Sequence, residues 1–227
     1  MNPALMSRYP KLKGFIFIVT YGRSGSTVLQ SILQTIPRSH ISGENYNALY
    51  GLHQSVASVR RTKRIWGKKE RAANHPWYMA DTIDPNRFAH RLTKVFVEEV
   101  IRPPTDVTWI GFKEIRYPQT NENFERLLNF MRKKFPNSYI VLNSRRTEDV
   151  VKSKWWAKKP EAEVTRLIKG MDGRFASYAE KYPDSCFHVH HQETVLGAQN
   201  LLPLFEALGE EMDQDRVNSI LSLKLKH

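Results

Sequence analysis

Residues 15–35 constrain the fold of this chain more than any other segment. They read as an apolar run (FIFIV, 15–19), a loop of small and polar residues (TYGRSGST, 20–27), and a stretch with helical apolar spacing that closes at Pro37. A strand, such a loop and a helix together present backbone N–H groups and a helix N-terminus to an anion. Arg23 adds a positive charge at the centre of the loop. We therefore expect a strand–loop–helix unit that holds a phosphate or sulfate group.

The loop lacks the signature of nucleoside triphosphate binding. That signature, G-x-x-x-x-G-K-[ST], supplies a lysine to the terminal phosphates and a hydroxyl to magnesium. Here the cation comes before the second glycine, and no Gly-Lys pair exists at this point. We therefore expect the anion to be something other than the end of an ATP–magnesium complex. A P-loop kinase is the alternative enzyme class, and it would depend on magnesium.

Strands and helices are predicted to alternate along the chain. Apolar runs predict strands at 15–19, 107–114, 139–143 and 186–190. A further short strand is expected just before Glu44. Helical spacing predicts helices at 27–35, 88–100, 124–134, 148–156, 166–182 and from 201 onward. This alternation predicts an α/β fold, a three-layer sandwich with a central parallel sheet covered by helices on both faces. The chain has no repeat or linker, so we expect one domain, 1–227.

The composition fits a globular protein with anionic partners. No apolar run reaches about 18 residues, so no membrane-spanning helix is expected. Residues 1–13 lack an apolar signal region, and the single Cys186 fits a reducing compartment, which together predict a cytoplasmic location. The formal net charge of +12 favours a nucleotide, an acidic glycan or a nucleic acid as partner. The sequence leaves the oligomeric state open.

A second candidate anion site follows the predicted strand 139–143. Arg145 comes at the end of that strand, and Ser153 lies eight residues further on, which we expect to be about two turns into the next helix. Arginine offers bidentate charged hydrogen bonds to a phosphate, and serine adds a neutral donor. The pair alone is a weak signal. Placed after a strand and downstream of loop 20–27, it predicts a second phosphate site at the same edge of the sheet.

The two patterns resemble those of sulfotransferases that use 3′-phosphoadenosine 5′-phosphosulfate (PAPS). Residues 20–27 resemble the loop T-Y-P-[KR]-S-G-[ST]-T that binds the 5′-phosphosulfate, with Gly22 in place of proline. The family motif for the 3′-phosphate, R-x7-S and commonly R-[ND]-P-x-D-x-x-x-S, is matched by Arg145, Asp149 and Ser153. The resemblance implies a P-loop-containing nucleoside triphosphate hydrolase-like fold. It also implies sulfuryl transfer from PAPS, with adenosine 3′,5′-bisphosphate (PAP) as product.

Further segments extend the resemblance to about residues 14–210. Residues 111–117 (GFKEIRY) are similar to a strand end of bacterial and carbohydrate-type members, and 154–157 (KWWA) and 187–194 (FHVHHQET) also match that group. A carbohydrate or glycoconjugate hydroxyl is therefore the expected acceptor. The R-K-G-x-x-G motif of cytosolic small-molecule members is absent. The tail offers only Lys224 and Lys226 to complete the 3′-phosphate site.

The resemblance implies a role for each matching residue. Arg23 corresponds to the catalytic Lys or Arg of the family loop and would contact the bridging oxygen and the 5′-phosphate. Lys113 would support the sulfate in the transition state, unless it is only a surface lysine at a strand end. The residues expected to bind the nucleotide are Arg23, Ser24, Gly25, Ser26, Thr27, Arg145 and Ser153.

The catalytic base has several candidates. Glu44 is favoured, because heparan-type and bacterial carbohydrate members carry their base glutamate at that point. Its alternative role is that of a carboxylate near a helix N-terminus. Glu114 is the second candidate, or else a structural orienter that pairs with Arg116 or Arg23. His40 and His53 are candidates on chemistry alone.

Three other features remain after these assignments. His188, His190 and His191 form a cluster without a carboxylate or cysteine at ligand spacing, so no metal is expected. Of Trp155 and Trp156, one is expected in the core and one could line a cleft.

The basic run 60–71 (RRTKRIWGKKER), within an insertion at about 55–80, is either a solvated face or a mobile lid over an anionic acceptor. A basic nucleic-acid-binding protein is the other alternative function. The chain shows no recognised module for it, so no nucleic-acid partner is expected.

Overall fold

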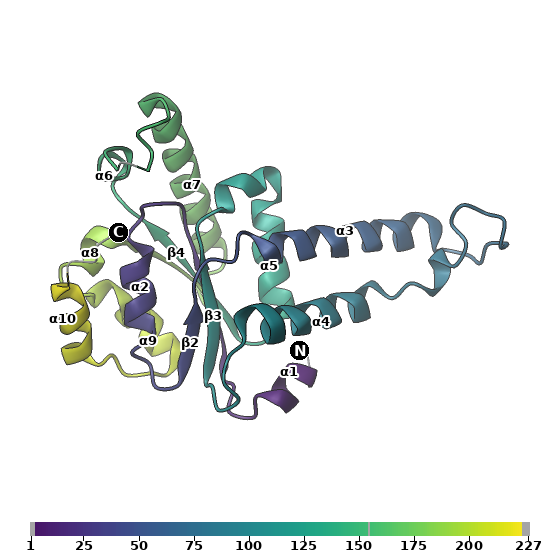
Figure 1. The fold of residues 1–227 in the computed structure, drawn as a ribbon, viewed down its shortest axis with the longest axis horizontal. Helices are drawn as coiled ribbons and strands as arrows, with labels where there is room; N and C mark the ends of the chain where they lie inside the picture. The colour runs from purple at the N-terminus through teal and green to yellow at the C-terminus, as the bar shows by residue number, and fades with distance from the viewer. Residues whose placement is uncertain (1–2, 154, 224–227) are drawn as a thin grey trace.

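The computed structural model describes residues 3–153 and 155–223. Lys154, Lys224 and Lys226 lie outside the described residues. A single five-stranded sheet with parallel pairing and the order β2-β3-β1-β4-β5 runs through the molecule (Figure 1). Its strands are β1 (Gly14–Val19), β2 (Ser39–Ser42), β3 (Trp109–Glu114), β4 (Ser138–Ser144) and β5 (Cys186–His190). The predicted α/β fold with a central parallel sheet is confirmed.

The helices alternate with the strands, as the sequence predicts. The α-helices are α1 (Pro3–Arg8), α2 (Ser26–Leu33), α3 (Ala48–Trp66), α4 (Pro85–Val95), α5 (Phe124–Lys134), α6 (Thr147–Val151), α7 (Glu161–Lys181), α8 (His191–Thr194), α9 (Leu202–Leu208) and α10 (Gln214–Ser222). The other helical segments are η1 (Ala80–Thr82), η2 (Phe96–Ile101), η3 (Tyr117–Asn123) and η4 (Gln199–Leu201). Within the described ranges, none of these helices is long and apolar enough to cross a membrane.

The central strand β1 divides the core into two layers. All six of its residues are buried, and their side chains alternate between the two faces of the sheet. Phe15 and Phe17 belong to the cluster that includes buried residues of α3, α4, α5 and α7. Ile16 and Ile18 belong to the cluster with α2, α9 and α10. Figure 1 shows these two groups of helices on opposite faces of the sheet, which makes the three-layer sandwich.

Helices α3 and α4 form an arm that extends away from the sheet (Figure 1). We call residues 48–95 the arm. Helix α3 was not predicted from the sequence, because only Leu49 and Val56 of its 19 residues are buried and its apolar period is therefore weak. The basic run 60–71 begins inside this helix and continues into the loop at the far end of the arm.

Candidate functional site

The predicted site residues meet at the carboxyl edge of the sheet, where the strands of an α/β fold usually present a ligand site. A cavity of about 670 Å³ opens there. It is lined by segments that end or follow all five strands. The lining residues are Arg23, Gly25, Ser26, Thr27, Val28, Glu44, Lys113, Ile115, Arg116, Arg145, Trp155 and His191. Two of the predicted nucleotide-binding residues, Ser24 and Ser153, are not part of this lining.

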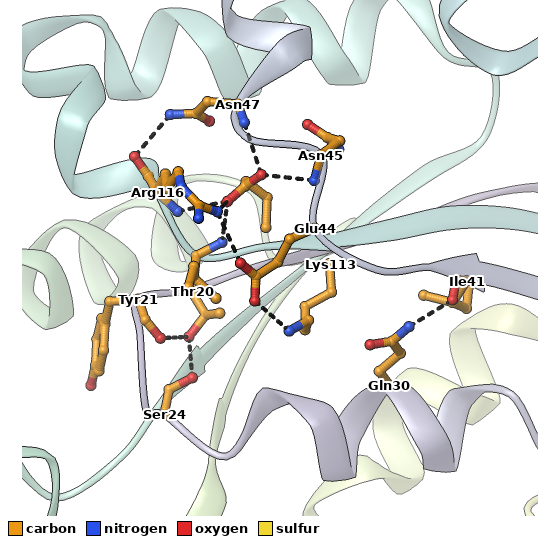
Figure 2. Close-up of polar contacts among 12 residues, drawn as sticks. Thr20, Tyr21, Ser24, Gln30, Ile41, Glu44, Asn45, Asn47, Lys113 and Arg116 are labelled. Atoms are coloured by element: carbon orange, nitrogen blue, oxygen red, sulfur yellow. Dashed lines mark hydrogen bonds and ion pairs between the residues drawn. The ribbon is translucent and has the colours of Figure 1, made fainter. Parts of the chain in front are cut away.

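Buried hydrogen bonds fix the loop after β1 to strand β4. The Thr20 hydroxyl lies 2.7 Å from the Ser24 hydroxyl (Figure 2). It also lies 2.6 Å from the Asn143 carbonyl oxygen. The Asn143 side chain donates to the Ser24 carbonyl oxygen at 3.1 Å. The Ser24 side chain is therefore directed into the protein, and an anion could meet only the backbone of this residue.

Two residues of the same loop have a left-handed backbone conformation. Arg23 has φ 67° and Gly25 has φ 78°. Helix α2 begins directly after Gly25, and no described side chain caps its N-terminus. The loop therefore leads into a helix start whose backbone N–H groups no side chain satisfies, which suits an anion.

The two glycines of the loop are packed against aromatic rings. A Cβ atom on Gly22 would lie 1.3 Å from the Trp155 ring, and one on Gly25 would lie 2.3 Å from Nδ1 of His191. This explains why Gly22 replaces the proline of the resembling motif, since Trp155 occupies the space that a side chain would need. Trp156 also reaches the loop, because its indole N–H donates to the Gly22 carbonyl oxygen at 3.2 Å.

The helix after Arg145 is shorter than predicted. It was expected to span 148–156 and to carry Ser153 two turns along, but α6 ends at Val151. Ser153 lies in the turns beyond, where the Trp156 N–H donates to its carbonyl oxygen. The two tryptophan contacts with Gly22 require the chain to leave the helix here, and this tertiary packing overrides the local helical pattern.

A buried polar network joins the two anion-binding segments. The Arg145 backbone N–H donates to the Tyr21 hydroxyl at 3.0 Å, and that hydroxyl donates to the Asp172 carboxylate at 3.0 Å. The Ser144 hydroxyl donates to the same carboxylate at 2.6 Å and lies 2.7 Å from Nε2 of His188. Tyr21 belongs to the first loop and Arg145 to the second, so the network fixes one relative to the other.

Burial controls the charges within and beside this network. It raises the pKa of Asp172 above its usual value, although the hydroxyls of Ser144 and Tyr21 oppose that change. Burial, followed by repulsion from His190, lowers the pKa of His188 to about 4. Burial and then the charge of Arg145 lower the pKa of His191 to about 4 as well. Both imidazoles are therefore neutral at pH 7. Arg145 then supplies positive charge beside a neutral His191 in the cavity wall.

Glu44, Lys113 and Arg116 form a group of ion pairs in the wall of the same cavity, which we call the carboxylate clamp. One oxygen of Glu44 lies 2.9 Å from the Lys113 ammonium nitrogen, and the other lies 2.9 Å from a guanidinium nitrogen of Arg116 (Figure 2). Burial alone would raise the pKa of Glu44, but the hydrogen bonds and charges of Lys113 and Arg116 outweigh it and lower the pKa. Glu44 is therefore an ionised carboxylate in the cavity, and its side chain is 31% exposed.

Glu114 has a different environment from Glu44. Its side chain is 1% exposed and accepts hydrogen bonds from the backbone N–H groups of Asn45, Asn47, Ile115 and Arg116. It also pairs with the Arg116 guanidinium at 3.0 Å. Because its oxygens are occupied by backbone donors and it does not line the cavity, the geometry favours the orienting role over that of a base. Arg116 is thereby held between the two carboxylates.

The remaining candidates lie away from the cavity. His40 is bonded to the Ile101 carbonyl oxygen at 3.1 Å, and His53 lies on the arm. His188 and His190 are neighbours, with ring centroids 4.6 Å apart. In residues 3–153 and 155–223, no group of three His, Cys, Asp or Glu side chains is placed to hold a metal ion.

Several residues that shape the site were not singled out from the sequence. His191 lines the cavity, whereas the sequence placed it only in a histidine cluster to which no site role was given. Asp172 lies in the middle of a helix that reads as core and carried no signal of its own. Tyr21 is part of the quoted loop motif, and its position between two anion-binding segments was the available clue.

A protein-family model described as the sulfotransferase family matches residues 16–213. The chain belongs to the sulfotransferase family. This match covers both anion-binding segments and the Glu44 clamp, and it supports sulfuryl transfer as the class of reaction. The resemblance seen in the sequence is thereby confirmed at the level of the family, and the five-stranded sheet agrees with the fold it implies. A comparison with curated proteins gives no match.

Proposed function

We propose that this sulfotransferase moves a sulfuryl group from PAPS to a carbohydrate hydroxyl. The main support for the proposal is that one cavity contains an ionised Glu44 paired with Lys113, the anion-binding loop and Arg145. The cavity thus offers a base on one side and sites for anionic groups on the other. A cytoplasmic location remains a prediction from the sequence.

The donor is matched by Arg145 and Arg23, of which the Arg145 guanidinium makes one hydrogen bond, to the Arg23 carbonyl oxygen at 3.3 Å. The Nε atom of Arg145 is buried and has no hydrogen-bond partner, and the nearest carboxylate oxygen, on Asp149, is 3.9 Å away. Arg23 makes no ion pair with any described carboxylate. We assign the 5′-phosphosulfate to Arg23 and the backbone of residues 24–27. We assign the 3′-phosphate to Arg145, with Ser153 as an additional donor.

The reaction needs a base and charge stabilisation. The acceptor oxygen forms a bond to sulfur while the bond from sulfur to the bridging oxygen of the donor breaks, and the electron pair stays on the PAP phosphate. Glu44 takes the proton that leaves the acceptor hydroxyl. Arg23 and Lys113 stabilise the charge that develops on the leaving oxygen and on the sulfuryl oxygens. As in phosphoryl transfer, positioning and electrostatic stabilisation carry most of the catalysis.

A carbohydrate acceptor is supported by an aromatic ring beside the base. Tyr46 is 79% exposed, and its ring lies under the Arg116 guanidinium at 4.3 Å from carbon to centroid. Arg116 in turn pairs with Glu44. An exposed ring fixed in this way offers an apolar face next to a polar group, which suits the face of a sugar. Trp155, 54% exposed at the opposite wall, offers a second ring.

Transfer of label from PAPS tests this proposal. We expect the protein to transfer ³⁵S from labelled PAPS to members of a panel of oligosaccharides, and Arg145→Ala to raise the KM for PAPS. Transfer only to phenols or amines would contradict the carbohydrate part. Transfer from ATP in place of PAPS, with a magnesium requirement, would favour the kinase alternative.

A further inference from the structure

A second cationic site lies on the arm, outside the cavity described above. It is a groove of about 570 Å³ between one face of α3 and the start of α5. We call it the arginine groove and define it by His53, Arg60, Arg61, Arg64 and Arg126. The four residues on α3 recur at helical spacing, so the cations share one side of that helix. The groove also contains Ala57 and Ser58, whose short side chains leave room between the guanidinium groups.

The charges of the groove are not neutralised within the described part of the chain. Arg60, Arg61 and Arg64 form no ion pair with any described carboxylate within 4.0 Å, and Arg126 makes only a 3.4 Å hydrogen bond to the side-chain oxygen of Asn123. Some surface cations elsewhere are paired, for example Lys159 with Glu163 at 2.9 Å. An unpaired group of arginines in a concave surface is suited to a ligand that brings its own negative charge.

The positive charge of the groove affects the half-buried His53 and the buried Lys134. Burial lowers the pKa of His53, and the charges of Arg60 and Arg126 lower it further. Burial also lowers the pKa of Lys134, with Arg60 as the next contribution. The Nδ1 atom of His53 is buried and has no hydrogen-bond partner. The groove therefore has a concentrated positive charge and a neutral imidazole that could accept or donate a hydrogen bond.

The chemistry of the lining favours one class of anion carrier. Guanidinium groups bind sulfate, carboxylate and phosphate in a bidentate manner. Apart from His53, the lining contains no aromatic ring, whereas single-stranded nucleic acids are bound by stacking their bases on such rings. It also contains no large apolar side chain that could enter a lipid surface. Sulfate or carboxylate groups on a sugar chain fit this lining best.

The groove is joined to the proposed catalytic site by helix α3. That helix begins at Ala48, soon after Glu44, and reaches Arg64 near its end. At 1.5 Å per residue, Arg60 and Arg64 lie about 18 and 24 Å along the helix from Ala48. The other wall, α5, follows η3 and the carboxyl end of β3, which carries Lys113. A single sugar could not span this distance, but an extended oligosaccharide could.

We propose that the arginine groove binds sulfate or carboxylate groups of an acidic oligosaccharide, the acceptor whose hydroxyl reaches Glu44. This inference rests on the proposed function for the identity of the ligand as acceptor. Binding in the groove itself does not depend on the nucleotide. The two ideas can therefore fail separately.

The experiment measures binding of a fluorescein-labelled heparin dodecasaccharide by fluorescence anisotropy, without nucleotide. Arg60→Ala/Arg64→Ala removes two charges from the groove, and Lys68→Ala/Lys69→Ala removes two charges from the loop at the end of the arm as a matched control. All four residues are exposed, so both variants should fold, which thermal melting checks. We expect the groove variant to lose at least tenfold in affinity and the control to lose less than twofold. PAP affinity should stay unchanged in both.

Other outcomes would overturn the proposal. Equal losses in the two variants would show attraction by net charge alone. A labelled single-stranded oligonucleotide of equal charge that binds as tightly through the same arginines would replace the glycan with nucleic acid. Binding to phosphatidylserine vesicles that depends on Arg60 and Arg64 would replace it with a membrane surface. Loss of heparin binding with unchanged ³⁵S transfer to acidic oligosaccharides would remove the groove from acceptor recognition. Absence of PAP binding in the wild type would overturn the proposed function but leave the groove.

Discussion

Replacing Tyr21 with phenylalanine tests whether the buried network positions Arg145. The Tyr21 side chain is fully buried, and its hydroxyl bonds the Arg145 backbone N–H and the Asp172 carboxylate, each at 3.0 Å. Tyr21→Phe keeps the ring, which stacks on Phe175 with centroids 6.1 Å apart, and removes only the oxygen. The variant therefore isolates the hydrogen bonds from the packing.

The expected magnitude follows from the groups left without partners. A buried polar group that loses its partner costs about 1–3 kcal/mol. Ser144 still donates to Asp172, so the second loss is partly compensated. We expect about 2 kcal/mol of destabilisation, which for a domain of this size lowers Tm by about 4–8 °C. If Arg145 loses part of its fixed position as well, PAP affinity should fall about tenfold, equivalent to about 1.4 kcal/mol.

Tyr178→Phe provides the matched control. Tyr178 is also buried and donates to the Asn129 side chain at 3.0 Å, but it lies outside the cavity. Calorimetric titration with PAP and thermal melting should be run on both variants. We expect both to melt earlier, and only Tyr21→Phe to bind PAP more weakly. Unchanged PAP affinity in Tyr21→Phe would refute the coupling between the two anion-binding segments.

Three further predictions concern the clamp and the loop. Glu44→Gln should lower kcat by about 10²–10⁴-fold, as loss of a general base does, with PAP affinity unchanged in calorimetry; near-normal turnover would remove Glu44 as the base. Because the pKa of Glu44 is lowered from 4.5, the base stays ionised above that pH, and activity is lost only as the pH falls through the lower value. The acidic limb of kcat/KM should therefore lie below pH 4.5, and a limb near pH 6 would point to a different group. Gly22→Ala should cost about 1–3 kcal/mol by overpacking against Trp155, measured by urea denaturation, and Trp155→Gly should relieve that cost in the double variant. An equal cost in the presence and absence of Trp155 would show that the ring is not responsible.

The sheet and most helices follow from local sequence patterns. Strand β5 and helix α5 have the predicted bounds, because a short buried run and a strong amphipathic period are each complete within their own segment. Helix α3 was missed, since an arm that packs along a narrow strip needs few apolar residues. The end of α6 was misplaced because Trp155 and Trp156 contact Gly22, more than 130 residues earlier.

The candidate site shows the same division between local and distant information. Sequence patterns and the family resemblance together named Glu44 and Lys113, which follow or end predicted strands. They did not show that Arg116 shares the Glu44 carboxylate, which depends on the parallel pairing of β2 with β3. The bond between Tyr21 and Asp172 joins residues 151 positions apart, and no local pattern marks Asp172. Contacts of this kind depend on the assembled sheet and the packing of α7 against it.

The central claim is that the cavity binds the sulfotransferase nucleotide through Arg23 and Arg145. Calorimetric titration with PAP in EDTA, beside a titration with ATP and magnesium, tests it most directly. We predict micromolar PAP binding that Arg145→Ala weakens strongly, together with no measurable binding of ATP. Absence of PAP binding, or a preference for ATP with magnesium, would contradict the assignment of both anion-binding segments.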